Sequence, residues 1–267
     1  MPPPITRVDG PAGRFYDIGG VLYPSVTHIL TAVNKPALVY WAANEERKLV
    51  SAAAADLYLD FAGQLVPPVM PRDSYAATLA ARLGPAKAHQ KALAKAGDIG
   101  TDAHKKVEWW LRTQIGAAAG PEPGIRDAAE WAFMAFQDWA RSVALKPVLI
   151  EKTVYSTRYG YAGTLDLLAR VNGVLTEISL KTSKAIYGEA HLQSAAYQTA
   201  LVEMGYALPA GGSLILRLPK VETDPAFEVV PVAPAAELLP VFLAVQQVWA
   251  WQYGQESAYH ARKKAVA

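Results

Sequence analysis

Two carboxylates and a lysine lie close together in the stretch GTLDLLARVNGVLTEISLKTS, residues 163–183. Asp166 lies near its start, while Glu177 and Lys181 lie on either side of Ser179 toward its end. Carboxylates and a lysine on one surface of a β-sheet are typical of sites that bind a divalent cation and hydrolyse phosphodiesters. Such a site requires these side chains to share one face of a sheet.

The dipeptide Asn172–Gly173 predicts a tight β-hairpin, because type I′ turns need positive φ at both central residues. A two-residue loop places Asp166 directly opposite Ser179, and opposed residues share a face. Period-2 alternation puts Glu177 and Lys181 on that same face. The other face is apolar and is expected to pack on a core: Leu165, Leu167, Val174, Ile178 and Leu180.

The remaining pattern predicts an α/β fold, with a short mixed β-sheet flanked by helices. Residues 1–145 are expected to form a mainly helical N-terminal part, with helices over 35–62, 74–83, 85–114 and 125–144. The third of these is predicted to be interrupted near Gly97–Gly100, and a proline-rich break is expected over 66–74. Residues 146–267 are expected to carry the sheet, so that the whole forms one compact domain.

The predicted elements of the second part follow a fixed order. Segments with period-2 alternation indicate five strands: 147–156, 161–171, 173–182, 212–220 and 226–232. Two helices are expected at 188–205, after the third strand, and at 234–264, after the fifth.

Composition excludes several classes of protein. The 267 residues include no cysteine, which excludes disulfides, thiolate zinc sites and iron–sulfur clusters. No apolar run approaches the roughly 18 residues of a membrane span, and the N-terminus lacks the pattern of a signal peptide. We therefore expect a cytoplasmic protein, in the host cytoplasm if the chain is phage-encoded. The net charge of +2 is too small to indicate a partner.

Some polar and aromatic residues recur at helical spacing. Lys87, Lys91 and Lys95 are four residues apart and form one basic stripe, which indicates either a solvated helix face or a surface that binds phosphates. Four tryptophans are predicted to be core residues, with base stacking by one of them as the alternative: Trp109, Trp110, Trp131 and Trp139.

Five phrases in chain order resemble the motifs of PD-(D/E)XK nucleases of the RecB type: GTDAH, Glu151, YAGTLD, EISLKTS and QSAAY. This family includes phage exonucleases and the mitochondrial genome-maintenance exonuclease. The resemblance covers residues 100–197, and PSVTHILTAVNKPALVYWA extends it to about residue 25. It implies a restriction-endonuclease-like core and a metal-dependent DNA exonuclease, with single-stranded DNA ends as the favoured substrate.

The resemblance also implies roles for individual residues. His104 and Asp166 would bind Mg²⁺ or Mn²⁺, and Lys181 would orient or deprotonate the attacking water or neutralise the transition state. Three further residues would complete the site: Glu151 through hydrogen bonds or a second ion, and Gln193 and Tyr197 along the cleft. Taken alone, His104 would more often be a histidine satisfied in a core, and Tyr197 would suit packing as well as it suits a site. The lysine stripe, Arg158 and Tyr161 are the expected contacts to the DNA backbone.

The family pattern places Asp or Glu where this chain has Ser179. Serine is a neutral and weak metal ligand, so its presence at this position should weaken cation binding. Three explanations are open: the carboxylate has migrated to Glu177 or Glu189, the protein is a natural non-catalytic DNA binder, or Asp was replaced by Ser through engineering. We favour the third, because the other motif residues are intact. The competing function is a non-catalytic nucleic-acid-binding protein of replication or recombination.

Overall fold

The structure is a computed structural model that describes residues 3–33, 35–62, 71–85, 87–221, 223–224 and 226–266. The chain divides into two compact units. The helical unit is Asn34–Asp98, and the core unit combines Met1–Val33 with Ile99–Ala267. The division expected at residue 145 therefore does not coincide with a boundary between compact units.

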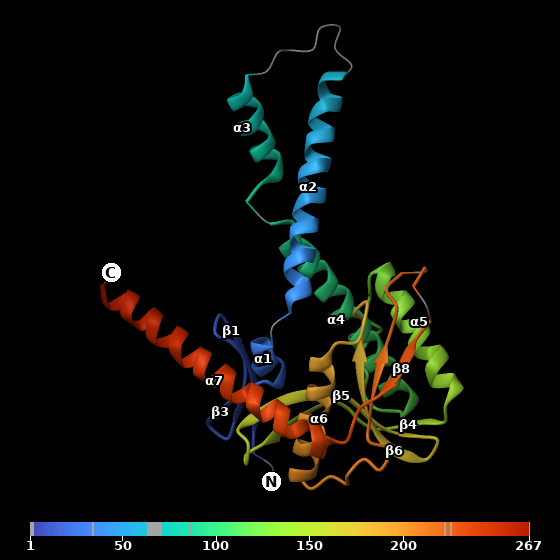
Figure 1. Cartoon of the computed structure of the whole chain (residues 1–267). Coiled ribbons are helices and arrows are strands. Elements are labelled where there is room, and N and C mark those ends of the chain that lie inside the picture. Colours follow the sequence, from blue (N-terminus) through green and yellow to red (C-terminus); the bar gives the residue numbers. More distant parts are fainter. Residues whose placement is uncertain are drawn as a thin grey trace. The chain divides into compact units, whose positions relative to one another are not determined.

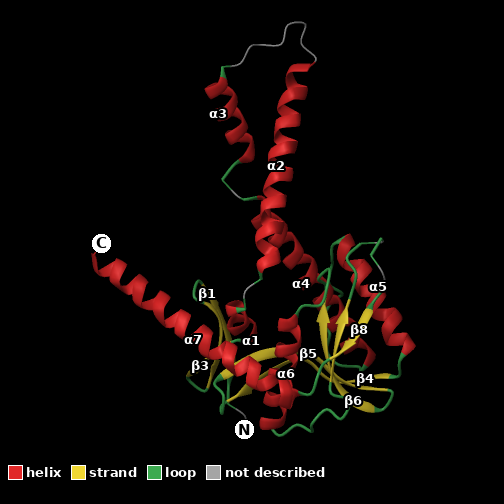
Figure 2. Cartoon of the chain, in the orientation of Figure 1, coloured by secondary structure: helices red, strands yellow, loops and turns green. Residues whose placement is uncertain are grey.

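The N-terminal residues form a three-stranded antiparallel sheet rather than helices. Its strands are β1 (Ile5–Gly10), β2 (Gly13–Ile18) and β3 (Val21–Pro24), drawn in yellow in Figure 2. The turn between β2 and β3 is made by Gly19 and Gly20, both at positive φ, which glycine adopts without a steric penalty. The first part is mainly helical, as expected, but these three short strands were not among the predicted elements, because alternation over four to six residues is a weak signal for a strand.

The helical unit contains α2 (Pro36–Ala62), α3 (Arg72–Leu83) and the start of α4 (Ala88–Gln114). Within the unit α2 contacts α3, and an ion pair joins Asp60 to Arg82. The expected break near Gly97–Gly100 does not occur, since α4 runs through both glycines; each costs about 1 kcal/mol of helix propensity, which the rest of the helix outweighs. Most of the proline-rich break, residues 66–70, lies outside the described residues.

The core unit is built on a five-stranded mixed sheet in the order β4-β5-β6-β7-β8 (Figure 1). The strands are β4 (Leu145–Ser156), β5 (Tyr161–Val171), β6 (Val174–Lys181), β7 (Ser213–Arg217) and β8 (Glu228–Pro231). Only β6 and β7 are parallel, and α6 (Gly188–Glu203) connects them. This confirms the α/β class and the mixed sheet expected from the sequence.

Two hydrophobic cores cover the sheet. The first contains α4 residues such as Val107 and Leu111, α5 (Asp127–Ser142) and the sheet residues Leu167, Ile178 and Leu180. The second contains residues of α1 (Val26–Ile29), η1 (Leu30–Ala32), α6 and α7 (Ala235–Val266), together with Leu165 and Leu168. Figure 1 shows α6 and α7 packed against each other. The core unit therefore holds its sheet between two groups of helices.

The hairpin register agrees with the prediction up to Leu167. Paired residues of β5 and β6 have numbers that sum to 345, from Val171 with Val174 to Leu167 with Ile178. The ladder then ends, and Asp166 is not paired through its backbone with Ser179. Leu165 packs in the second core although Leu167 packs in the first, so the alternation of β5 is interrupted at Asp166.

Candidate metal centre

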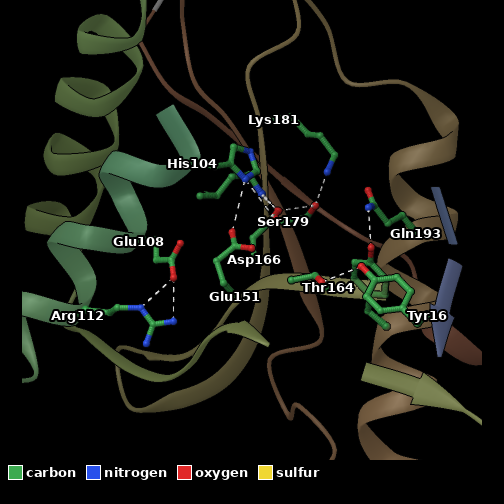
Figure 3. A network of polar contacts seen from close by, with 12 residues as sticks. Tyr16, His104, Glu108, Arg112, Glu151, Thr164, Asp166, Ser179, Lys181 and Gln193 are labelled. Carbon is green, nitrogen blue, oxygen red and sulfur yellow. Dashed lines mark hydrogen bonds and ion pairs between the residues drawn. The ribbon is translucent and has the colours of Figure 1, made fainter. Parts of the chain in front are cut away.

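Three side chains from three different elements converge beside the end of this ladder (Figure 3). His104 Nδ1 lies 3.4 Å from Asp166 Oδ1 and 3.8 Å from Glu151 Oε1. One ligand atom from each residue lies within 4.8 Å of those of the other two. The side chains are 30%, 13% and 27% exposed for His104, Asp166 and Glu151, so the cluster is reachable from solvent. We call these three residues the His–Glu–Asp cluster.

Helix α4 presents His104 to the cluster by burying the adjacent face of the helix. Ala103, Val107 and Leu111 are each about 1% exposed and pack in the first core. His104 itself is half-buried, and its Nδ1 faces the carboxylates of Asp166 and Glu151. The alternative of a histidine satisfied within the core is therefore not what the structure shows.

Glu151 reaches the cluster through an unusual backbone conformation. Its φ is +46° in the middle of β4, a region that side-chain-bearing residues other than Asn and Asp seldom adopt. Its neighbours Ile150 and Lys152 pair with Leu167 and Leu165, so Glu151 stands across from Asp166. Strained backbone of this kind concentrates at functional sites.

Asp166 is held by the backbone of the next strand. Its Oδ2 accepts a 2.7 Å hydrogen bond from the amide of Leu180, which takes the place of a ladder hydrogen bond between β5 and β6. The other oxygen, Oδ1, faces His104. One carboxylate oxygen is thus fixed by the fold, and the other is directed toward the cluster.

Ser179 and Lys181 form a pair beside the cluster. Lys181 Nζ donates a 2.6 Å hydrogen bond to Ser179 Oγ, which lies 3.5 Å from Asp166 Oδ2. Ser179 is 1% exposed, whereas Lys181 is half-buried. The order Lys181, Ser179, Asp166 reproduces the proximity predicted from the hairpin, although Asp166 is drawn out of the ladder.

Opposite charges within the cluster stabilise one another. Burial lowers the pKa of His104, but attraction and hydrogen bonding to Asp166 and Glu151 raise it overall to about 10. Burial raises the pKa of Glu151, and repulsion from Asp166 adds to this effect. The pKa of Asp166 is lowered, since His104, Lys181 and the Leu180 amide outweigh the effect of burial. An imidazolium therefore lies where a cation would compensate the two carboxylates.

Glu177 does not belong to the cluster. It is fully buried, and neither of its carboxylate oxygens has a hydrogen-bond partner. Burial raises its pKa to about 8. Glu189, in the first turn of α6, is also outside the cluster. Neither candidate for a migrated carboxylate therefore meets His104 and Asp166, and Glu151 supplies the second carboxylate instead.

Gln193 and Tyr197 lie one turn apart on α6 and contact each other, with Gln193 Nε2 donating to Tyr197 Oη at 3.0 Å. Tyr197 is 3% exposed and covers Gly163, where an added Cβ would lie 2.5 Å from the tyrosine ring. Tyr197 is thus a packing residue of the second core, whereas Gln193 remains half-buried.

The expected DNA contacts differ in their exposure. Lys87, Lys91 and Lys95 are all exposed in the helical unit, and Arg158 is exposed in the turn between β4 and β5. Tyr161 is fully buried and donates to the carbonyl oxygen of Ala196 at 2.9 Å, so its expected contact with DNA is wrong. Its aromatic ring serves the second core instead.

The donor set of the His–Glu–Asp cluster fits a divalent cation. Two carboxylates and one imidazole are ligands for Mg²⁺ and Mn²⁺, and the imidazole favours Mn²⁺. No other group of three such side chains lies together in the part of the chain that the structure describes.

None of the described helices has the length and apolar character needed to cross a membrane. The chain matches no protein-family model and no curated protein.

Proposed function

We propose that this protein is a metal-dependent deoxyribonuclease that hydrolyses phosphodiester bonds, with single-stranded DNA ends as its favoured substrate. The observation that supports this most directly is the convergence of His104, Glu151 and Asp166 beside Lys181. These groups come from a helix and three adjacent strands, so the fold itself assembles them. The resemblance of their motifs to PD-(D/E)XK nucleases supports the same reaction.

The chain's own residues have separable roles in this proposal. A divalent cation supplies Lewis acidity toward phosphate and makes hydroxide available near neutral pH. His104, Glu151 and Asp166 would hold it, and the Leu180 amide keeps Asp166 in place. Lys181 places a positive charge next to the cluster, where it can stabilise charge that develops on the phosphate.

A nuclease assay tests the proposal. End-labelled single-stranded DNA is incubated with the protein and Mn²⁺, Mg²⁺ or EDTA, and labels at either end report the direction of digestion. We expect cleavage that requires metal and that falls at least about 100-fold in Asp166→Asn, because that change removes a ligand charge while keeping an acceptor for Leu180. Asp138→Asn is the matched control, since Asp138 is exposed on α5 and forms an ion pair with Arg141, away from the cluster. Circular single-stranded DNA separates an exonuclease from an endonuclease.

The competing function, a non-catalytic nucleic-acid-binding protein, is favoured by Ser179. This buried hydroxyl occupies the hydrogen bond of Lys181 that a carboxylate would otherwise take. Under that alternative the protein binds single-stranded DNA with or without metal, and neither the parent chain nor Ser179→Asp cleaves it. Cleavage by the parent chain that is abolished by Asp166→Asn would contradict the alternative.

A further inference from the structure

A cavity beside the His–Glu–Asp cluster is lined by the same helix that carries His104. It has a volume of about 420 Å³ and lies between α4 and the segment that follows it, within the core unit. Its walls are Lys105, Glu108, Trp109 and Arg112 on the helix and residues 118–121 and 123 on the following segment. We call it the α4 pocket.

The wall opposite the helix is fixed by polar contacts. Lys106 is 7% exposed, and its Nζ forms a 2.5 Å ion pair with Glu122 while lying 5.6 Å from the centroid of the Trp109 ring. Trp109 Nε1 also donates to the carbonyl oxygen of Gly120 at 3.3 Å. A lysine side chain is almost never buried unless an acidic group pairs with it, as Glu122 does here. Lys106 holds the segment against the helix and orients the indole that lines the pocket.

The chemistry of the α4 pocket suits a ligand with an aromatic ring and a negative charge. Lys105 is exposed, and Arg112 is half-buried. Arg112 Nε and Nη2 lie 2.9 Å and 2.8 Å from Glu108 Oε1, so Glu108 neutralises one of the two cations and fixes the guanidinium. The charged side chains of the pocket therefore have a net charge of one positive unit, which lies beside the Trp109 indole. Stacking on an aromatic ring next to cationic groups is how proteins hold single-stranded nucleic acid.

The pocket lies next to the His–Glu–Asp cluster. Glu108 follows His104 by one helical turn on α4. Figure 3 shows Glu108 and Arg112 beside Glu151. Arg112 is eight residues after His104, about 12 Å along the helix axis. A few nucleotides of a single DNA strand cover such a distance.

We propose that the α4 pocket is a nucleotide subsite, in which Trp109 stacks on a base of a single-stranded DNA and Lys105 and Arg112 contact its phosphates. The identity of the ligand rests on the proposed function of the neighbouring cluster. The subsite holds the strand a few nucleotides away from the bond that is cut. It therefore contributes to binding of the substrate rather than to the chemical step.

Binding measured in EDTA tests the subsite without cleavage. The fluorescence anisotropy of a labelled single-stranded oligothymidylate is followed with the parent chain and with Trp109→Leu, Trp109→Phe and Trp251→Leu. We expect Trp109→Leu to weaken binding by about tenfold, the typical loss for one stacked base. Trp109→Phe should retain most of the affinity. Trp251, 66% exposed on α7, is the matched control and should have no effect.

A second variant separates a lost ligand contact from a disturbed fold. Affinity for DNA falls as the salt concentration rises. In Arg112→Gln the steepness of this fall, on a log–log plot, should decrease by about 0.7, the contribution of one contact to a single-stranded phosphate. A general loss of packing would lower the affinity without changing this slope. Thermal unfolding of each variant shows whether the helix and its following segment remain folded.

The outcomes distinguish the subsite from the proposed function. A parent chain that binds and cleaves DNA, with both properties unchanged in Trp109→Leu and Arg112→Gln, overturns the subsite alone. A parent chain that neither binds nor cleaves overturns both proposals. Equal losses in Trp109→Leu and Trp251→Leu also overturn the subsite, since they would indicate an effect unrelated to the pocket.

Discussion

Lys181 Nζ lies 2.6 Å from Ser179 Oγ, so the lysine of the candidate site is paired with a neutral hydroxyl rather than with a carboxylate. Ser179 Oγ also lies 3.5 Å from Asp166 Oδ2, the oxygen that accepts a hydrogen bond from the Leu180 amide. A negative charge introduced at position 179 would therefore lie between Lys181 and Asp166. Its desolvation would be offset by the ammonium group of Lys181.

We expect Ser179→Asp to bind Mn²⁺ at least about tenfold more tightly than the parent chain, because each added carboxylate strengthens a hard-cation site. The rate of DNA cleavage should increase with it. Isothermal titration of Mn²⁺ and the end-labelled DNA assay measure the two effects. Ser179→Asn, which has the same shape without the charge, is the control; equal behaviour of the two variants would contradict a role for position 179 in metal binding.

The affinity of the His–Glu–Asp cluster for metal should increase with pH. The pKa of His104 is about 10 without metal, so the imidazole must lose a proton before it can bind a cation. Between pH 6 and 9 the apparent affinity for Mn²⁺ is expected to rise by up to about tenfold per pH unit. Titrations in two buffers of different ionisation enthalpy should report about one proton released per ion. An affinity independent of pH would show that His104 is not a ligand.

Glu177 should make the folded protein less stable as the pH rises. Its pKa is about 8 in the folded state and near 4.5 in the unfolded chain, so the folded state holds one more proton between these values. This proton makes the free energy of unfolding fall with pH across this window, with a slope on the order of 1 kcal/mol per pH unit, and the contribution of Glu177 levels off above about pH 8. His104, whose pKa is raised to about 10, adds a fall of the same sign at higher pH.

Urea denaturation at pH 5, 6, 7 and 8 measures this slope. Glu177→Gln should make it flatter, because the amide does not titrate. Asp138→Asn, at an exposed position, should leave the slope as it is in the parent chain. Parallel slopes in the parent chain and Glu177→Gln would mean that Glu177 is ionised in the folded protein.

The exposed lysine stripe gives a prediction about salt. Lys87, Lys91 and Lys95 would each neutralise one phosphate if the stripe binds DNA. Replacing all three by alanine should then make the fall of log affinity with log salt less steep by about 2 for single-stranded DNA. Lys146→Ala, at an exposed position of β4, should change the slope much less. An unchanged slope in the triple variant would identify the stripe as a solvated helix face.

The hairpin and most helices could be predicted from the sequence because local signals determine them. Asn172 has φ of +50° and Gly173 of +88°, as the type I′ turn requires, and the register of β5 and β6 follows from that turn. The resemblance implied a supporting role for Glu151, but its direct approach to His104 and Asp166 could not be predicted from the local pattern. It depends on a positive φ at one residue of β4, and no local pattern around a glutamate indicates such a conformation.

The burial of Glu177 and Tyr161 was also beyond the sequence pattern. Alternation correctly placed Glu177 on the polar side of its strand, but it does not tell whether a helix covers that position. Tertiary packing likewise places Tyr161 against Phe242, with ring centroids 5.0 Å apart, in a core that forms between distant segments. Such contacts depend on how the elements pack, which period-2 and period-3.6 patterns do not specify.

Gly163 of the phrase YAGTLD is expected to be required for the position of Tyr197. An alanine Cβ at this site would lie 2.5 Å from Cε1 and 2.9 Å from Oη of the tyrosine, so the ring or the strand must move. Overpacking of this kind costs about 1–3 kcal/mol. We therefore expect Gly163→Ala to lower the free energy of unfolding by about that amount. Gly188→Ala is the control, since a Cβ there meets no atom within 4 Å.

The double variant Gly163→Ala with Tyr197→Leu tests the cause of that loss. If the clash with the ring is responsible, the second substitution removes it, and the two effects on unfolding are not additive. The Gln193 side chain, which donates to Tyr197 Oη, loses that acceptor in both the single and the double variant that carry Tyr197→Leu. Urea denaturation of the parent chain, the two single variants and the double variant completes the cycle. Additive effects would show that Gly163 is needed for the backbone of β5 and not for the approach of Tyr197.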